Sequence, residues 1–150
     1  RHATGTLFER ASMILTPMPD VDIETLEAAK AFFLETGFKT VRITTPEEHD
    51  RIIAFTSQLA HIVSSAYVKS PEAQKRRGFS AGSFQDMTRV ARLNETMWTE
   101  LFLDNADLLV PSIDDLILRL TQYRHALAEE DADELRELLK EGRIMRENLD

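Results

Sequence analysis

The segment DLLVPSIDDLILRLTQYRHALAEE, residues 107–130, carries the most regular hydrophobic pattern of the 150-residue chain. Its apolar side chains recur at alternating intervals of four and three residues, which places them along one stripe of an α-helix. The stripe consists of Leu109, Ile113, Leu116, Leu120, Tyr123 and Leu127. Three heptads of this kind can line the inside of a helical bundle or the seam of a dimer, and the pattern favours neither. Both alternatives predict a mainly helical fold.

A second long helix is predicted upstream, from residue 46 to about residue 69. Thr45 is suited to cap its start, Pro46 suits the first helical position, and the side chain of Glu48 can bond back to Thr45. The apolar residues of this segment follow helical spacing and predict a core-facing stripe. They are Ile52, Phe55, Leu59, Ile62, Val63 and Ala66.

The segments that flank residues 107–130 are also predicted to be helical. Residues 70–82 are expected to form a loop, and residues 83–105 a helical region with a break near Asn94. Ser83 and Asp86 resemble a capping box at the start of that region. A last helix is predicted over 132–149. Residues 129–150 hold nine acidic and four basic side chains, a net charge of −5, which indicates a solvated helix face.

The first 45 residues show a different pattern. The apolar run SMILTP (12–17) predicts a buried strand, and FKTVRIT (38–44) predicts a second strand. Between them lies an amphipathic helix that Asp20 or Asp22 can cap and that Gly37 can end. A strand, a helix and a strand within so few residues predict a βαβ unit with parallel strands. Because two strands cannot form a stable sheet alone, we expect this unit to be the end of a larger α/β domain.

The composition excludes several classes of protein. A net charge of −8 and a pI of about 5.0 argue against binding to nucleic acids. The absence of cysteines excludes a disulfide scaffold and a thiolate metal site and is compatible with the cytoplasm. No apolar run is long enough for a membrane span, and no secretion leader opens the chain. The sequence lacks the GxGxxG motif of dinucleotide-binding turns. It also lacks the HExxH motif of zinc sites, and we expect no metal.

Two groups of side chains are candidates for binding. Arg89 stands three residues after Asp86, so it can form a surface ion pair with that residue or grip an anionic ligand with its planar guanidinium. His61 stands one helical turn after Ser57, with no acidic partner in view for a catalytic triad. It can make a simple hydrogen bond or contact a ligand. Trp98 is the only tryptophan, suited to a core or a pocket wall.

Three stretches of the chain resemble the prephenate dehydrogenase family. They are ILTP (14–17), GFKTVRITTPEEHDRIIAFTSQLAH (37–61) and GSFQDMTRVARLNETMWTELFLDN (82–105), which follow one another in the family's order. The pattern F-x-D-x-T-R-x-A, with M-W and an asparagine downstream, is the most specific of these motifs. The resemblance runs from about residue 7 to residue 150.

The resemblance implies a fold and a reaction. Residues 1–45 would be the C-terminal remnant of a Rossmann domain that binds NAD or NADP, and residues 46–150 would form a helical domain for substrate binding and homodimerisation. The whole enzyme would convert prephenate to 4-hydroxyphenylpyruvate by oxidative decarboxylation, in tyrosine biosynthesis. Arogenate and cyclohexadienyl dehydrogenases share this architecture and remain alternatives, as does a purely structural dimerisation module without ligand binding.

The resemblance also implies roles for individual residues. Arg89 would bind a substrate carboxylate, Asp86 would hold or gate Arg89, and His61 would contact the substrate. Further members of the substrate site would be Gly82 and Ser83 at the pocket edge and Met97 and Trp98 on its wall. His49 would mark the helix that begins the second domain.

The chain departs from the family at two points. The family often has S-H-L-P-H in the long helix, whereas this chain reads Ser57-Gln58-Leu59-Ala60-His61, so the first histidine is replaced by Gln58. The family's catalytic histidine and its cofactor-binding glycines belong upstream of the residues compared here. We therefore expect this chain to be a fragment of the enzyme that contains no catalytic residue and is inactive alone.

Overall fold

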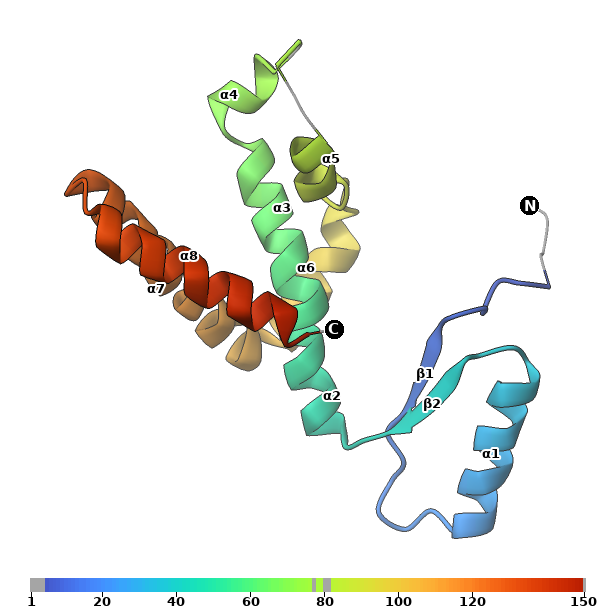
Figure 1. Cartoon of the computed structure of the whole chain (residues 1–150). Coiled ribbons are helices and arrows are strands. Elements are labelled where there is room, and N and C mark those ends of the chain that lie inside the picture. The colour runs from blue at the N-terminus through green and yellow to red at the C-terminus, as the bar shows by residue number, and fades with distance from the viewer. Residues whose placement is uncertain (1–4, 77, 80–81, 150) are drawn as a thin grey trace. The chain divides into compact units, whose positions relative to one another are not determined.

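The computed structural model describes residues 5–76, 78–79 and 82–149 (Figure 1). The chain divides into two compact units, Arg1–Ile53 and Ala54–Asp150. A short βαβ unit comes first, and helices make up nearly all of the rest. The predicted fold class is therefore confirmed.

The first unit contains the two predicted strands and the helix between them. Strand β1 (Ser12–Leu15) pairs with β2 (Thr40–Ile43) in parallel. Helix α1 (Ile23–Glu35) connects the two strands and packs against β2. In the register of the sheet, Ser12 lies opposite Thr40, and their hydroxyl oxygens are 2.8 Å apart.

Both ends of α1 follow the predicted capping pattern. Of the two candidate caps, Asp22 is the one used, since its carboxylate accepts hydrogen bonds from the Thr25 backbone N–H at 2.8 Å and the Thr25 hydroxyl at 2.7 Å. These bonds stabilise the charged carboxylate and lower the pKa of Asp22 below its ordinary value. After the helix, Gly37 has a φ of 101°, in the left-handed region that favours glycine.

The first unit has a thin hydrophobic core. Among residues 5–53, no side chain is fully buried, and Ile23 and Phe32 remain more than half exposed. Its main apolar cluster is aromatic: the ring of Phe38 lies 4.5 Å from that of Phe8 and 5.8 Å from that of Phe33. A two-stranded sheet of this kind buries too little surface to be stable alone, and the assignment of this unit to a larger α/β domain stays a prediction.

The second long helical stretch begins as predicted but is not a uniform α-helix. It consists of α2 (Pro46–Ile53), the π-helical segment η1 (Ala54–Leu59) and α3 (Ala60–Val68). The Thr45 hydroxyl caps α2 by accepting a bond from the Glu48 backbone N–H at 3.2 Å. The carboxylate of Glu48 pairs with Arg51.

The π-helical segment changes which side chains face inward. The predicted stripe is partly wrong, because Ile52, Phe55 and Ala66 are exposed. Ala54 and Gln58 are buried instead, together with Leu59 of the predicted set. A π-turn contains more residues than an α-turn, so it rotates the inward face relative to the regular 3.6-residue period from which the stripe was predicted.

Three shorter helices follow. Within the predicted loop 70–82, Pro71–Gln74 form helix α4, so that prediction is partly wrong, and residues 77, 80 and 81 lie outside the described residues. The Ser70 hydroxyl supports α4 by accepting a bond from the Glu72 N–H at 3.3 Å. Helix α5 (Gly82–Thr88) begins one residue earlier than predicted, which places Ser83 in its first turn and not at the cap.

The predicted break in the next helical region is confirmed. Helix α6 (Glu95–Asp104) starts after a non-helical stretch, and the side-chain oxygen of Asn94 accepts a bond from the Met97 N–H at 3.0 Å. This cap explains the break, because asparagine satisfies a free N–H group at the beginning of a helix. The break separates Trp98, on α6, from Arg89.

Helices α7 (Ala106–Ala128) and α8 (Ala132–Glu147) pack side by side as a hairpin (Figure 1). The hydroxyl of Tyr123 donates a bond of 3.1 Å to the Leu138 carbonyl and ties the two helices together. On α7, Arg119 makes two hydrogen bonds to Asp115, which raise the pKa of the guanidinium. Of the predicted α7 stripe, Leu109 is buried whereas Leu120 is exposed.

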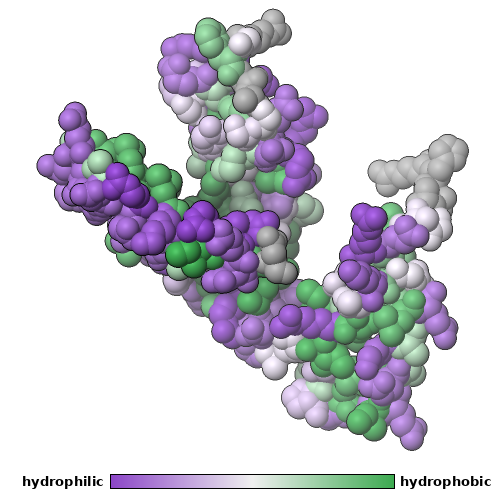
Figure 2. Space-filling view, viewed as in Figure 1, coloured by the Kyte–Doolittle hydropathy of each residue, from purple (hydrophilic) through white to green (hydrophobic). Residues whose placement is uncertain are grey.

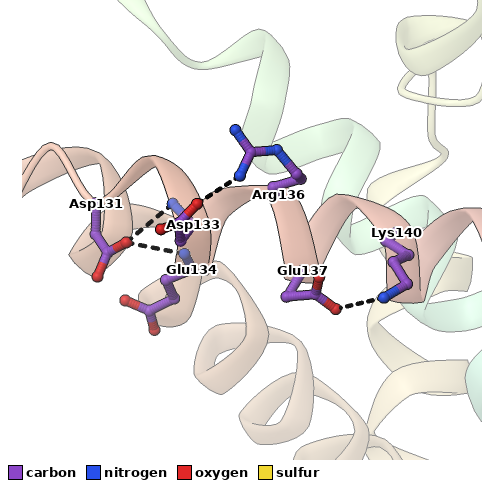
Figure 3. A network of polar contacts seen from close by, with 6 residues as sticks. All are labelled: Asp131, Asp133, Glu134, Arg136, Glu137 and Lys140. Carbon is purple, nitrogen blue, oxygen red and sulfur yellow. Dashed lines mark hydrogen bonds and ion pairs between the residues drawn. The ribbon is translucent and has the colours of Figure 1, made fainter.

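The outer face of α8 is solvated and rich in ion pairs, as the sequence predicted (Figure 3). Asp131 caps the helix by accepting bonds from the backbone N–H groups of Asp133 and Glu134. Exposed pairs one turn apart follow, among them Lys140 with Glu137 at 2.8 Å. Such exposed pairs add little stability. Figure 2 shows this hydrophilic surface beside hydrophobic side chains that are exposed on the same hairpin.

Candidate functional site

Arg89 lies immediately after the end of α5 and lines an open cavity of about 980 Å³. Two more arginines, Arg76 and Arg92, line the same cavity. The remaining lining residues are uncharged: Val68, Ala73, Gln74, Phe84, Thr88 and Ala91. The described lining therefore presents three guanidinium groups and no carboxylate, which is suited to an anionic ligand.

The surroundings of Arg89 differ from the simple helical pair that the sequence allows. Because α5 ends at Thr88, Arg89 leaves the helical spacing that would bring it to Asp86. Within the described part of the chain, no ion pair joins Asp86 to Arg89. The Thr88 hydroxyl donates a bond of 2.7 Å to the Phe84 carbonyl and supports the last turn of α5.

Phe84 also helps to shape the arginine cavity. The guanidinium carbon of Arg76 lies 5.0 Å from the centre of the Phe84 ring, within the range of a cation–π contact. The ring of Tyr67, on α3, lies 5.8 Å from the same ring. These contacts join α3, α5 and the segment after α4, and they restrict the position of Arg76.

His61 and Trp98 form a second candidate group. Their rings stack at 4.1 Å between centroids and 29° between planes, and the Phe102 ring lies 5.2 Å from that of Trp98. The Nδ1 atom of His61 lies 2.8 Å from the Ser57 carbonyl oxygen. Since a carbonyl can only accept, Nδ1 carries the proton, and Nε2 of the neutral ring is left as an acceptor for a ligand.

Gln58 supports this stacked pair. It is 6% exposed, its amide nitrogen donates to the Leu101 carbonyl at 3.1 Å, and its amide oxygen accepts from the Asn105 side chain at 2.9 Å. In the sequence, Gln58 stands out only as a departure from a family motif. The signal that could have indicated this role is a polar residue beside the apolar stripe. A polar side chain that is buried there requires hydrogen-bond partners.

The other predicted site residues lie at exposed positions. Gly82 and Ser83 begin α5, and Ser83 lines a second open cavity, of about 680 Å³, that shares Arg76 and Phe84 with the arginine cavity. Met97, on α6, is about half exposed. His49, on α2, lies in the first unit, where its Nδ1 is 2.9 Å from the Asp50 carboxylate.

The structure therefore forms two groups and not one. Arg89 shares its cavity with Arg76 and Arg92, whereas His61 and Trp98 pack on each other and are not among the residues that line that cavity. Within the described ranges, no three His, Asp or Glu side chains are close enough together to hold a metal ion. No helix among the described residues is both long enough and apolar enough to cross a membrane.

Comparisons with known proteins match most of the chain. Residues 45–141 match the dimerization domain of prephenate dehydrogenase. A cyclohexadienyl dehydrogenase of Zymomonas mobilis is 33% identical over 147 residues, which are 93% of this chain and 50% of that protein.

Solved structures agree. A prephenate dehydrogenase from A. aeolicus, in complex with hydroxyphenyl propionate and NAD+, is 31% identical with a TM-score of 0.80, covering 97% of this chain and 52% of that one. A Synechocystis arogenate dehydrogenase is 26% identical with a TM-score of 0.79, covering 97% of this chain and 54% of that one. The chain thus spans about half the length of the relatives that it matches.

Proposed function

The chain belongs to the prephenate dehydrogenase family, and on that premise we propose that it is the substrate-binding and dimerisation part of an enzyme that oxidatively decarboxylates prephenate to 4-hydroxyphenylpyruvate. The observation that carries this proposal is the arginine cavity. Prephenate carries carboxylates, and the cavity offers guanidinium groups with no competing carboxylate among its described lining residues.

In this proposal Arg89 binds a carboxylate of the substrate. Its guanidinium has no ion-pair partner among the described residues, so its donors are available to a ligand. Asp86, three residues earlier on α5, would hold or gate the guanidinium in the complete enzyme. Gly82 and Ser83, at the start of the same helix, would form the pocket edge.

His61, Trp98 and Met97 would contact the ring of the substrate. The free Nε2 of His61 can accept a hydrogen bond, and the indole provides an apolar wall beside it. Because these residues and Arg89 form separate groups in this chain, we propose that the complete site needs the rest of the enzyme, and that this chain alone is inactive.

The dinucleotide is assigned to residues outside this chain. The loop between β1 and α1, residues 16–22, contains no glycine, so this βαβ unit lacks the glycine-rich turn that holds a pyrophosphate. The residues present do not fit NAD or NADP by themselves. We propose that the whole protein binds the cofactor, and that residues 1–45 are the end of its Rossmann domain and residues 46–150 its second domain.

A homodimer is the partner that the helical unit fits. Four apolar side chains of α7, spaced by seven, three and seven residues, are each more than half exposed. They are Val110, Ile117, Leu120 and Leu127, called here the free seam. Side chains at such heptad positions pair helix against helix, so the free seam supports association with a second copy of the chain.

Kinetics of the complete enzyme test the role of Arg89. We expect Arg89→Ala to raise the Michaelis constant for prephenate by about tenfold or more, because a charged hydrogen-bond partner of the substrate is lost. The matched control is Arg136→Ala, which removes an exposed arginine paired with Asp133 on α8. An unchanged Michaelis constant in Arg89→Ala would rule out its assigned role.

The alternative that this chain serves only for dimerisation rests on the same free seam. A calorimetric titration of the complete protein with 4-hydroxyphenylpyruvate separates the two functions. A saturable heat signal that Arg89→Ala weakens supports the substrate site. A dimer that shows no saturable heat signal supports the purely structural function.

A further inference from the structure

The positive charge of this acidic chain is concentrated in the sequence segment that supplies the three arginines of the cavity. Residues 69–92 contain six lysines and arginines against two acidic residues, a net charge of +4 in a chain whose total is −8. The cavity is lined by three of the six, Arg76, Arg89 and Arg92. Arginines that line one open cavity add to its positive potential, and that potential attracts anionic ligands.

One carboxylate does not account for this arrangement. A single planar guanidinium can bind a carboxylate with two parallel hydrogen bonds, so Arg89 alone satisfies the role proposed above. Arg76 and Arg92 remain, and Arg76 is held in place by its contact with the ring of Phe84 at 5.0 Å. A cavity of about 980 Å³ is large enough for a ligand that contacts more than one arginine.

We propose that Arg76 and Arg92 form a second anion subsite beside Arg89, and that this subsite selects a dianionic 2-oxo dicarboxylate over its 2-amino analogue. The inference rests on the proposed function. Prephenate has a ring carboxylate and a 2-oxo acid side chain, with a net charge of −2. Arogenate carries an ammonium group in place of the oxo group, so its net charge is −1.

The lining of the cavity explains the direction of this preference. An ammonium group beside the second carboxylate would face Arg76 and Arg92, and the described lining offers it no carboxylate as a partner. Discrimination of this kind comes from repulsion of the wrong ligand as well as attraction of the right one. We therefore assign to Arg76 and Arg92 the preference for prephenate over arogenate.

Steady-state kinetics of the complete protein with both substrates test this inference. Arg92→Gln and Arg76→Gln each remove one charge, and we expect each to lower the ratio of kcat/KM for prephenate over arogenate by about tenfold. The loss should lie in the Michaelis constant for prephenate. Arg92→Lys, which keeps the charge, should retain most of the preference, and Arg136→Gln should leave the ratio unchanged.

The outcomes separate the inference from the proposed function. An unmodified protein that does not oxidise prephenate refutes the proposed function. A protein that oxidises prephenate but whose substrate ratio is the same in Arg92→Gln, Arg76→Gln and Arg136→Gln refutes the inference alone. A rise in the Michaelis constant for the cofactor, with that for prephenate unchanged, would assign these arginines to the cofactor's phosphates and also overturn it.

Variants that fail to fold are recognised from their unfolding transitions. In that case the charge-retaining Arg92→Lys and the unmodified protein are compared by binding of each substrate at rising salt. The inference expects prephenate affinity to fall more steeply with salt than arogenate affinity, because two charges of the ligand are neutralised and not one. Equal slopes would contradict it.

Discussion

Gln58 connects the π-helical segment to α6. Its amide nitrogen donates to the Leu101 carbonyl, its amide oxygen accepts from the Asn105 side chain, and the residue is almost fully buried. His61 follows it by three residues, and Trp98 precedes Leu101 by three. The bonds of Gln58 therefore lie about one helical turn from each of the stacked rings. We infer that they hold α6 at the distance at which the Trp98 ring stacks on the His61 ring.

Replacing Gln58 by leucine should destabilise the fold. The change keeps much of the side-chain volume but removes both hydrogen bonds, which leaves two partially buried polar groups without this partner. We expect the free energy of unfolding to fall by about 1–3 kcal/mol, measured by urea denaturation. The control Gln85→Leu, at an exposed position of α5, should change it by about 0.5 kcal/mol or less.

The position of Trp98 gives this prediction a second measurement. Because Trp98 is the only tryptophan, its emission reports directly on the stack with His61. We expect a changed emission maximum and faster quenching by acrylamide in Gln58→Leu under conditions where the variant is folded. A loss of stability with unchanged emission and quenching would show that Gln58 supports the core without positioning Trp98.

At the scale of elements, the starts of several helices could be predicted from the sequence, whereas the π-helical segment could not. The starts of α1, α2 and α6 follow from side chains that bond free N–H groups within three residues, so Asp22, Thr45 and Asn94 were readable from the sequence. The segment Ala54–Leu59 packs against α7, which comes much later in the chain. That contact is distant in sequence, and no local rule predicts it.

The cap of α1 leads to a pH-dependent prediction. Since hydrogen bonds from Thr25 lower the folded pKa of Asp22, its stabilising contribution is fully present above the unfolded pKa, near 3.8, and is lost as the pH falls through the lower folded value. NMR titration of the Asp22 carboxyl group should give a pKa below 3.8. Asp22→Ala should be less stable at neutral pH and should lose this acid-dependent component.

Asp20 provides the matched control for that experiment. It lies two residues before the cap in the same loop, and it was the other candidate in the sequence. We expect Asp20→Ala to leave both the stability of α1 and its acid dependence unchanged. Equal effects of the two substitutions would show that general charge near the helix, and not the specific bond to Thr25, produces the stabilisation.

At the scale of the whole molecule, the apolar side chains of the heptad pattern in residues 107–130 divide between buried and exposed positions. Leu109 is buried within the chain, and Tyr123 bonds to α8, whereas Leu120 and Leu127 remain exposed. The order of apolar residues predicted the helix, but two residues of the free seam, Val110 and Ile117, are outside the predicted stripe. That order could not assign the apolar residues to buried or exposed positions, because the division depends on where η1 and α8 pack against α7.

The exposed members should determine the oligomeric state. Introducing Ile117→Glu together with Leu120→Glu places two negative charges in the centre of the free seam, where burial of a charge without a partner is costly. We expect the dimer dissociation constant to rise by at least about tenfold, measured by sedimentation equilibrium at micromolar concentration, with helical content retained. Gln122→Lys, on the opposite side of α7, should leave the dimer unchanged, since Gln122 lines the small cavity towards α8. A double variant that dimerises as well as the unmodified protein would place the interface on another surface.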